Sequence, residues 1–215
     1  MNELALIVIA KAPVPGRCKT RLCPPCTLEQ AAALAEAALA DTLAAVADTP
    51  DERRVLALEG EPGPWLPPGF ELVSQGSGGL GERLAGAFDA VGGPALLVGM
   101  DTPQLNPELL TQAAAVLMRE PAGAVLGTSP DGWYWAIGLR RADPRVFAGV
   151  PMSSPVTARV QRRRLRALGL RSRELGSLRD VDTIDDAHAV AAVAPESRFA
   201  RALATLDTVP RVDAA

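Results

Sequence analysis

The sequence is poor in several features whose scarcity narrows what the protein can be. Aromatic residues make up only 4% of the 215 residues, so the core must consist mainly of aliphatic side chains and alanine. No apolar run reaches the roughly 18 residues that a membrane span needs. The N-terminus leads straight into an apolar stretch without a basic segment or a cleavage site, so we expect no signal peptide and a cytoplasmic location.

Positive charge is also scarce. Lys and Arg number 22 against 25 Asp and Glu, and the net charge of −3 argues against a general nucleic-acid-binding protein. The densest basic segment is a predicted helix at 156–168, which carries Arg159, Arg162, Arg163, Arg164 and Arg166. We interpret it as a solvated face rather than an RNA-binding patch. We therefore expect neither nucleic acid nor a membrane as a partner, and the sequence leaves room for a homodimer.

Cysteine is rare as well, and all three residues lie in the opening loop: Cys18, Cys23 and Cys26. Their spacing matches the start of an iron–sulfur pattern that lacks its fourth cysteine. A zinc site would need another ligand, and the single histidine, His188, is far away in sequence. A redox pair of Cys23 and Cys26 is an alternative. Thiols with no required chemistry are the interpretation that we favour.

What the sequence does have is an alternation of apolar strands and helices. Strands are expected at 4–10, 54–58, 70–74, 94–100, 122–127, 132–139 and 171–175, and helices between and after them. Thr27 and Gln30 form a capping box that begins the first helix, whose leucines at 28, 34, 39 and 43 suggest one apolar face. The strand at 132–139 is expected to be antiparallel or to lie at an edge. This order predicts an α/β protein of three layers (α/β/α) around a mostly parallel, mixed sheet, with one domain over 1–208 and a frayed tail at 209–215.

The first strand runs into a loop that is rich in cations and contains a glycine. Lys11, Gly16, Arg17, Lys19 and Arg21 follow the apolar run in quick succession. Such a loop at the end of a buried strand can bind phosphate, because glycine permits close approach and the cations neutralise the anion. An ordinary solvated basic loop fits the same residues equally well, since no complete phosphate-loop signature is present.

Two groups of acids are candidates for a divalent metal site. Asp101 follows the strand at 94–100, where ligand sites of open α/β sheets lie. The alternative is a helix-capping role, which Pro107 weakens because it places the helix start several residues later. Asp180 and Asp182 flank one valine and would share a face of an extended segment. One of them together with Asp101 would make a two-carboxylate site for magnesium, unless the segment only caps the last helices.

A glycine-rich loop and an aromatic cluster complete the candidates. Gln75–Gly81 contains four glycines, which allow a base or ribose to approach the backbone, and Arg83 follows; a flexible surface loop is the alternative. Asp131, Gly132 and the aromatic residues 133–135 would line a ligand pocket or cover the edge of the sheet.

Together these motifs resemble a known family. AKAPVPGRCKTRL, QGSGGLGERL, VGMDTPQL, LGTSPDGWYWAIGL and LRDVDTIDDA are similar, in order and spacing, to blocks of small glycosyltransferase-A-like proteins of the nucleotide-diphospho-sugar transferase superfamily. The resemblance extends to 2-phospholactate guanylyltransferase and, more distantly, to molybdenum-cofactor guanylyltransferase. It covers roughly Leu4 to Asp186.

The resemblance implies a role for each block. Phosphates would be bound by Lys11, Gly16, Lys19 and Arg21, and base and ribose by Gln75, Gly78, Gly79, Gly81 and Arg83. Asp101 and Asp182 would bind Mg²⁺ or Mn²⁺, and the acceptor would lie near Asp131, Gly132 and Tyr134. Trp133 departs from the family, which usually has glycine there, and so do the cysteines of the opening loop.

Two transferase reactions fit this fold, and a third hypothesis is not enzymatic. We expect a nucleotidyltransferase that joins a nucleoside triphosphate to a small phosphorylated or acidic acceptor, with Lys19, Arg21 and Asp101 as catalytic residues. The alternative is a glycosyltransferase that uses a nucleotide-sugar, and the further one is a non-catalytic nucleotide-binding protein in which Trp133 closes the acceptor pocket. We expect Lys19 to be exposed and unimportant for stability.

Overall fold

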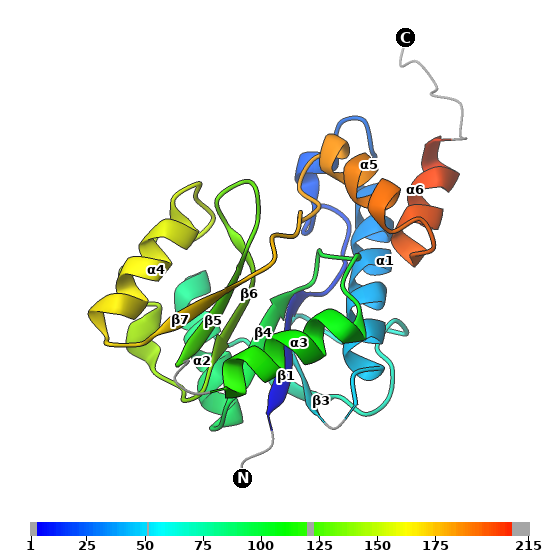
Figure 1. Cartoon of the computed structure of the whole chain (residues 1–215). Helices are drawn as coiled ribbons and strands as arrows, with labels where there is room; N and C mark the ends of the chain where they lie inside the picture. The colour runs from blue at the N-terminus through cyan, green and yellow to red at the C-terminus, as the bar shows by residue number, and fades with distance from the viewer. Residues whose placement is uncertain (1–3, 51, 120–122, 208–215) are drawn as a thin grey trace.

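The fold is known from a computed structural model, which describes residues 4–50, 52–119 and 123–207. The predicted frayed tail, 209–215, lies outside them. In chain order the elements are β1 (Ala5–Lys11), η1 (Thr20–Leu22), α1 (Leu28–Ala47), β2 (Arg53–Glu59), β3 (Glu71–Ser74), α2 (Leu80–Val91), β4 (Ala95–Gly99), α3 (Pro107–Met118), β5 (Ala124–Thr128), β6 (Tyr134–Leu139), η2 (Pro144–Val146), α4 (Thr157–Ala167), β7 (Ser172–Leu175), α5 (Ile184–Val193) and α6 (Arg198–Asp207). Figure 1 shows their arrangement.

The seven strands form a single mixed sheet in the order β3-β2-β1-β4-β6-β5-β7. Neighbouring strands are parallel except at β6, which runs antiparallel to both β4 and β5. The predicted mostly parallel, mixed sheet is therefore confirmed. The antiparallel direction of β6 is confirmed too, but its predicted alternative at an edge is wrong, because β6 is interior and every residue in it is buried.

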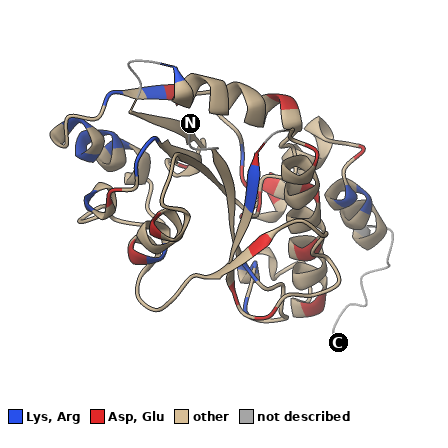
Figure 2. Ribbon diagram, turned by 90° about the horizontal axis from the view of Figure 1, so that it is seen from below, with Lys and Arg blue, Asp and Glu red and all other residues tan. Residues whose placement is uncertain are grey.

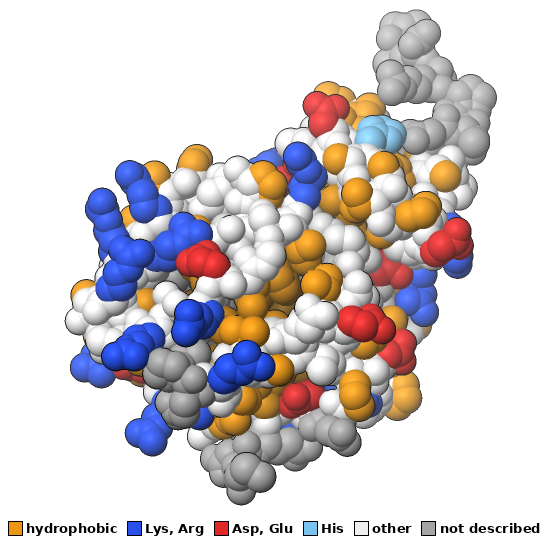
Figure 3. Space-filling view, viewed as in Figure 1, with side chains coloured by type: hydrophobic (Ala, Val, Ile, Leu, Met, Phe, Trp, Pro, Cys, Tyr) orange, Lys and Arg blue, Asp and Glu red, His pale blue; other side chains and the backbone are white. Residues whose placement is uncertain are grey.

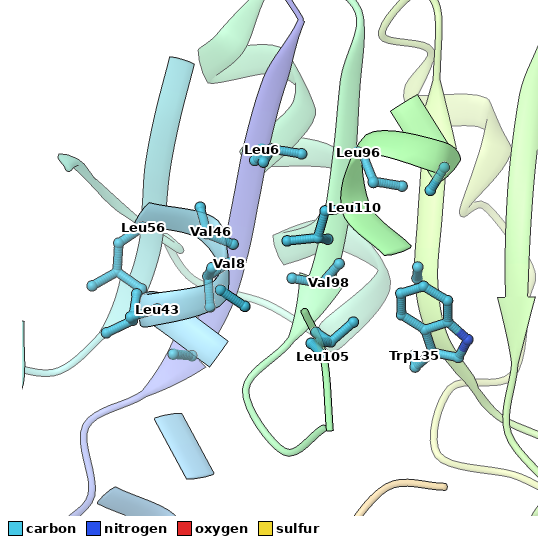
Figure 4. Close-up of a cluster of buried hydrophobic side chains, with 14 of the residues drawn as sticks. Leu6, Val8, Leu43, Val46, Leu56, Leu96, Val98, Leu105, Leu110 and Trp135 are labelled. Atoms are coloured by element: carbon cyan, nitrogen blue, oxygen red, sulfur yellow. The ribbon is translucent and has the colours of Figure 1, made fainter. Parts of the chain in front are cut away.

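Helices cover both faces of the sheet, so the predicted three layers are confirmed (Figures 1 and 2). Alternate residues of β1 serve the two faces, as the period of a strand requires. Leu6 and Val8 point into the core under α1 and α3, with Leu43 and Leu110 (Figure 4). Ile7 belongs to the opposite core, under α2 and α4. The residues are aliphatic or alanine for the most part, as the shortage of aromatics predicts.

A third apolar cluster joins α5 and α6 to the outer side of α1. Leu34 of α1 and Val181 in the segment before α5 are both buried in it. Helix α1 is therefore buried along two sides, which differs from the single apolar face expected, and Leu28 at its start is 45% exposed. By length and composition α1 could cross a membrane, but 56% of the tested stretch is buried inside the protein, as in a core helix.

The predicted helix starts agree with the structure. Thr27 caps α1 through a complete capping box with Gln30, and α3 begins with Pro107 after its cap, Asn106. Because Asn106 caps α3, the helix-capping alternative for Asp101 is wrong. At α5 the cap is Thr183, again with a capping box, so neither Asp180 nor Asp182 is used as a cap.

Candidate functional site

The candidate site lies at one edge of the sheet, where the parallel strands β1 to β4 end. Lys11 closes β1, Glu59 closes β2, Gln75 follows β3 and Asp101 follows β4. Because β6 is antiparallel, its first residues, next to Trp133, lie at the same edge. The carboxyl ends of parallel strands are where open α/β sheets bind ligands, so the topology brings together residues as far apart in sequence as Lys11 and Trp133.

Three carboxylates meet at this edge. One oxygen each of Asp101, Asp180 and Asp182 lies within 4.8 Å of the others. A backbone hydrogen bond from the amide of Val181 to the carbonyl of Asp101, 3.0 Å long, ties the two segments together. The Val181 side chain points into the third core, so the two flanking aspartates face the other way. The predicted pair of Asp101 and Asp182 is thus brought together, and Asp180 joins it.

The donor set of these three aspartates fits a hard divalent cation. Mg²⁺ and Mn²⁺ prefer carboxylate oxygens, and three such groups converge on a space that one ion could occupy. The position is already attractive to positive charge, because the ammonium group of Lys19 contacts it.

Lys19 bridges two of the three acids. Its Nζ atom donates to a carboxylate oxygen of Asp101 and, at 3.2 Å, to one of Asp182. The side chain is only 11% exposed, so the expected solvent exposure of Lys19 is wrong. Burial by itself lowers the pKa of an ammonium group, but the charges of Asp101 and Asp182 outweigh it and raise the pKa of Lys19. The residue is therefore charged and electrostatically tied to the acids.

Two further cations of the predicted phosphate loop, Lys11 and Arg21, also have acidic partners. Arg21 donates to Asp182 at 2.7 Å while remaining 66% exposed. Lys11 lies 3.0 Å from Glu59, a residue that sequence reasoning did not single out. Gly16 has a φ of +73°, a conformation that favours glycine and turns the loop between them. The loop is thus more nearly neutral than its composition suggests.

Asp180 is the most perturbed of the three carboxyls. Burial, and then the charge of Asp101, raises its pKa from 3.8 to about 7. Only 9% of the residue is exposed. Near neutral pH the Asp180 carboxyl is therefore partly protonated, whereas an ordinary aspartate would be fully ionised.

The raised pKa of Asp180 makes stability depend on pH with a definite sign. The stabilising effect of the raised pKa is complete below pH 3.8 and is lost as the pH rises through 7, because the ionised form is then forced into a buried, negatively charged site. Without divalent metal, Asp180→Asn should raise the free energy of unfolding at pH 8 by roughly 2 kcal/mol, and by much less at pH 5, and the melting temperature should rise accordingly. Thermal denaturation at both values tests this. The exposed neighbour variant Asp185→Asn should show no such pH dependence, and an equal effect of Asp180→Asn at both pH values would contradict it.

Gln75 and Arg83 form a second polar cluster at the ends of β2 and β3. The Gln75 amide nitrogen donates to the carbonyls of Ala10 and Ala57, at 2.6 and 3.0 Å. Its oxygen accepts from Arg83 at 3.1 Å, and Arg83 also pairs with Glu59 at 2.5 Å. Gln75 is therefore a buried brace that orients Arg83. Gln75 also lines the first cleft with Arg83 and Glu59, so its predicted contact with base and ribose stays a prediction.

The glycine-rich loop shapes the entry to α2. Gly76 and Gly78 have positive φ values of +71° and +100°. Gly79 is the N-cap of α2, and Gly81 lies so close to Met152 and Phe147 that a Cβ atom would press on them. The alternative of a flexible surface loop therefore explains only part of this segment, because its glycines are favoured by backbone conformation at Gly76 and Gly78 and by close packing at Gly81.

The aromatic cluster lies at the same edge. Trp133 and Tyr134 stack with ring centroids 4.7 Å apart, and the Asp131 side chain accepts a hydrogen bond from the Trp133 amide. Gly132 has a φ of +91°, and a Cβ there would collide with the carbonyl of Pro155. Burial raises the pKa of Tyr134, so its hydroxyl stays protonated.

Three clefts open around these residues. The first, about 230 Å³, is lined by Lys11, Glu59, Gln75, Arg83, Asp101 and Trp133, among others. The second, also about 230 Å³, lies along Lys11, Cys18, Lys19, Arg21 and Asp182. The third, about 460 Å³, contains all three acids of the metal group, with Asp131 and Trp133. They share lining residues, so one extended site runs past the three acids.

A family of uncharacterized proteins conserved in bacteria (DUF2064) matches residues 28–154. The chain belongs to this family. The matched residues include the glycine-rich loop, Asp101 and the aromatic cluster of the DUF2064 protein, and end before Asp180. No curated protein matches the sequence.

Solved structures identify the fold of this DUF2064 protein. A candidate nucleotide-diphospho-sugar transferase from Desulfovibrio desulfuricans G20 has a TM-score of 0.82 and 27% identity, covering 96% of this chain and 95% of that one. CMP:2-keto-3-deoxy-manno-octonic acid synthetase in complex with CTP has a TM-score of 0.57 and 11% identity, covering 91% and 99%. A protein of Mycobacterium tuberculosis H37Rv, Rv0371C, in complex with manganese, has a TM-score of 0.52 and 20% identity, covering 88% and 97%.

These likenesses confirm the predicted fold class and the resemblance to the nucleotide-diphospho-sugar transferase superfamily. The particular relationship to guanylyltransferases stays a prediction. Sequence reasoning missed the part that Glu59 plays in pairing with both Lys11 and Arg83. The sequence does contain a signal for Glu59: it is an acid at the end of an apolar strand, and that end of β2 lies at the candidate site.

Proposed function

We propose that this DUF2064 protein is a divalent-metal-dependent nucleotidyltransferase. One observation carries the proposal: Lys19 and Arg21 of the opening loop lie directly beside the Asp101, Asp180 and Asp182 carboxylates, at the carboxyl ends of the parallel strands, where open α/β sheets bind ligands. CTP is the ligand of one neighbour and manganese that of another. A nucleotide with its metal would need both groups of residues together.

In this reaction an acceptor oxygen attacks the α-phosphorus of a nucleoside triphosphate. A bond forms between that oxygen and the phosphorus, the bond to the bridging oxygen breaks, and pyrophosphate leaves with the electron pair. Charge accumulates on the phosphate oxygens, so cations and positioning carry most of the catalysis. Lys19 and Arg21 would neutralise the phosphates, and Lys11 would assist at the junction of the first two clefts.

Asp101, Asp180 and Asp182 would hold the metal, which we expect to be Mg²⁺ or Mn²⁺. When bound, such an ion supplies positive charge to the phosphate oxygens. Occupation of the site would require Lys19 to give up its contact with Asp101. The ammonium group would then be free to turn toward the phosphates in the second cleft, which it already lines.

Arg83 and Glu59 would meet the base or ribose in the first cleft. They offer a donor and an acceptor side by side, a combination suited to the edge of a nucleobase. Gln75 would position Arg83.

Glycosyl transfer from a nucleotide-sugar is the second candidate, and one observation favours it. Glycosyl transfer on this fold usually relies on an Asp-x-Asp metal motif, and Asp180-Val181-Asp182 has this form and reaches the metal group. The Asp101-Thr102-Pro103 segment contains only one acid, and the fold brings the Asp180-Val181-Asp182 motif next to it.

A thermal-shift screen discriminates the two reactions. With Mg²⁺ present, the four nucleoside triphosphates and common nucleotide-sugars are each added in large excess. We expect one triphosphate to raise the melting temperature by several degrees, since 100-fold saturation adds about 2.7 kcal/mol. Release of pyrophosphate on adding acceptors then reports turnover.

The shift should shrink in Lys11→Gln and persist in Arg173→Gln, which removes an exposed cation on β7, away from the clefts. A shift with nucleotide-sugars alone would select glycosyl transfer. No shift with any nucleotide would contradict both reactions.

A further inference from the structure

The third cleft adjoins the first and shares three lining residues with it: Leu80, Asp101 and Trp133. Trp133 lines both, with the glycine-rich loop and Arg83 on one side and Asp131 on the other. The first and second clefts contain the cations suited to a nucleotide. The third cleft, of about 460 Å³, is large enough for a small second substrate and adjoins the acids of the metal group. Its size and its position beside the metal group therefore suit an acceptor site.

The charges of the third cleft are mostly negative. Its lining includes one arginine, Arg21, and five carboxylates: Asp101, Asp131, Asp180, Asp182 and Asp186. Arg21 is already paired with Asp182, and Asp186 is paired with Arg179. Among the described residues, no lining cation is left over to receive a phosphate or carboxylate of an acceptor. A divalent ion on Asp101, Asp180 and Asp182, together with Arg21, would offset three of the five negative charges, so the lining stays negative and disfavours an anionic acceptor.

One of these acids is itself a sign of a missing ligand. Asp180 is 9% exposed and lines the cleft, yet its carboxylate makes no hydrogen bond or ion pair to another described residue. Its electrostatic neighbours are Asp101, Asp131 and Asp182, all of the same sign. A buried carboxylate normally has a partner, because desolvating it unpaired is costly. In the proposed function that partner is the divalent metal, which places the third cleft directly beside the reacting phosphate.

The remaining polar groups of the third cleft suit an uncharged, hydroxylated ligand. Ser153 lies exposed at the rim with a φ of +53°, and its hydroxyl makes no hydrogen bond to the described residues. Asp131 offers a second carboxylate oxygen besides the one that accepts from the Trp133 amide. Trp133 presents a broad apolar surface between them, which can also stabilise a cation by its π system.

We propose that the third cleft binds a small hydroxylated acceptor that carries no phosphate or carboxylate, and that an amino group on it strengthens binding. This rests on the proposed transferase function and changes the acceptor that the sequence led us to expect. In the transfer step, a hydroxyl oxygen forms the new bond to the α-phosphorus and pyrophosphate leaves. The hydroxyl proton passes to Asp131, a carboxylate of the cleft that lies outside the metal group and has no ion pair among the described residues.

Many basic residues of the protein lie away from the third cleft, on α4. Figure 3 shows many Lys and Arg side chains gathered over the region of α4. Arg159, Arg163 and Arg166 are exposed there and line none of the three clefts. The excess of cations on α4 thus contributes nothing to acceptor binding, and its solvated interpretation stands.

Binding of three related probes tests the proposal: glucose, glucosamine and glucose 6-phosphate. Ligand-detected NMR titrations are run on the full chain with Mg²⁺. We expect glucosamine to bind best, glucose next, and glucose 6-phosphate at least tenfold more weakly than glucose. Trp133→Leu should weaken glucose and glucosamine at least fivefold. Asp131→Asn should reduce the preference for glucosamine, whereas Asp89→Asn, an exposed acid on α2, should not.

Equal or tighter binding of glucose 6-phosphate would overturn the proposal, as would the absence of binding by all three probes. A thermal shift with nucleoside triphosphates on the same sample separates this result from the proposed function. A protein that binds nucleotide but prefers glucose 6-phosphate refutes only the acceptor assignment. A protein that binds glucosamine but no nucleotide refutes only the transferase.

Discussion

Replacing Asp101 with asparagine should abolish metal-dependent turnover. Asp101 is the acid that comes from the end of β4, whereas Asp180 and Asp182 come from the segment before α5. Its loss removes one of three negatively charged ligands and breaks the link between the two segments' carboxylates. We expect turnover to fall roughly 10²- to 10³-fold, the scale on which removal of one electrostatic contributor to a transition state acts.

The fold should survive this change. Lys19 keeps its contact with Asp182, and an asparagine of the same size leaves the backbone bond between Val181 and residue 101 in place. The measurements are calorimetric titration with Mn²⁺ and pyrophosphate release with the triphosphate found by the screen. Asp185→Asn, which removes an exposed acid of α5, is the matched control and should behave as the wild type. Unchanged Mn²⁺ affinity in Asp101→Asn would remove Asp101 from the metal site.

Replacing Lys19 with alanine should have two opposite effects. The protein should lose stability, by about 2 kcal/mol and thus several degrees in melting temperature, because Asp101 and Asp182 lose their shared cation and face Asp180 at close range. The estimate is kept low because those two acids are 27% and 33% exposed and water screens them. At the same time Mn²⁺ should bind about tenfold more tightly, because it no longer has to displace the ammonium group.

Lower stability together with tighter Mn²⁺ binding would distinguish Lys19 from a residue whose role is only structural. Saturating Mn²⁺ should raise the melting temperature of Lys19→Ala more than that of the wild type, while nucleotide turnover should fall. Arg17→Ala, which removes an exposed cation of the same loop, should change neither property. If Mn²⁺ bound more weakly to Lys19→Ala than to the wild type, Lys19 would be organising the acids rather than competing with the metal.

Much of the fold could be predicted because local patterns and their tertiary use agree. The apolar run of β1 is buried on both faces, as a central parallel strand must be, and the caps at Thr27 and Asn106 begin helices where they should. The interior position of β6 could not be predicted. An aromatic strand suits an edge or a centre equally, and the choice depended on which strands paired with it.

The site was predicted in its residue types and less well in their relations. Asp101 and Asp182 were chosen by their positions after strand and loop, and they do come together. The partners of the cations were out of reach, because Lys19 and Asp182 are 163 residues apart in sequence. Composition shows that a loop is basic, but only contacts show that Lys11, Lys19 and Arg21 are already paired with acids.

By itself the sequence determined the class of fold, the edge of the sheet that carries the site, and the kinds of group found there. Those features follow from periodicity, caps and the chemistry of single residues, which act over a few positions. The tertiary structure alone decided that Lys19 is buried among acids, that Asp180 joins Asp101 and Asp182, and that no described cation lining the third cleft is left unpaired. Each of these depends on burial and on distances between segments far apart in the chain, and electrostatic energy is set by such distances rather than by sequence order.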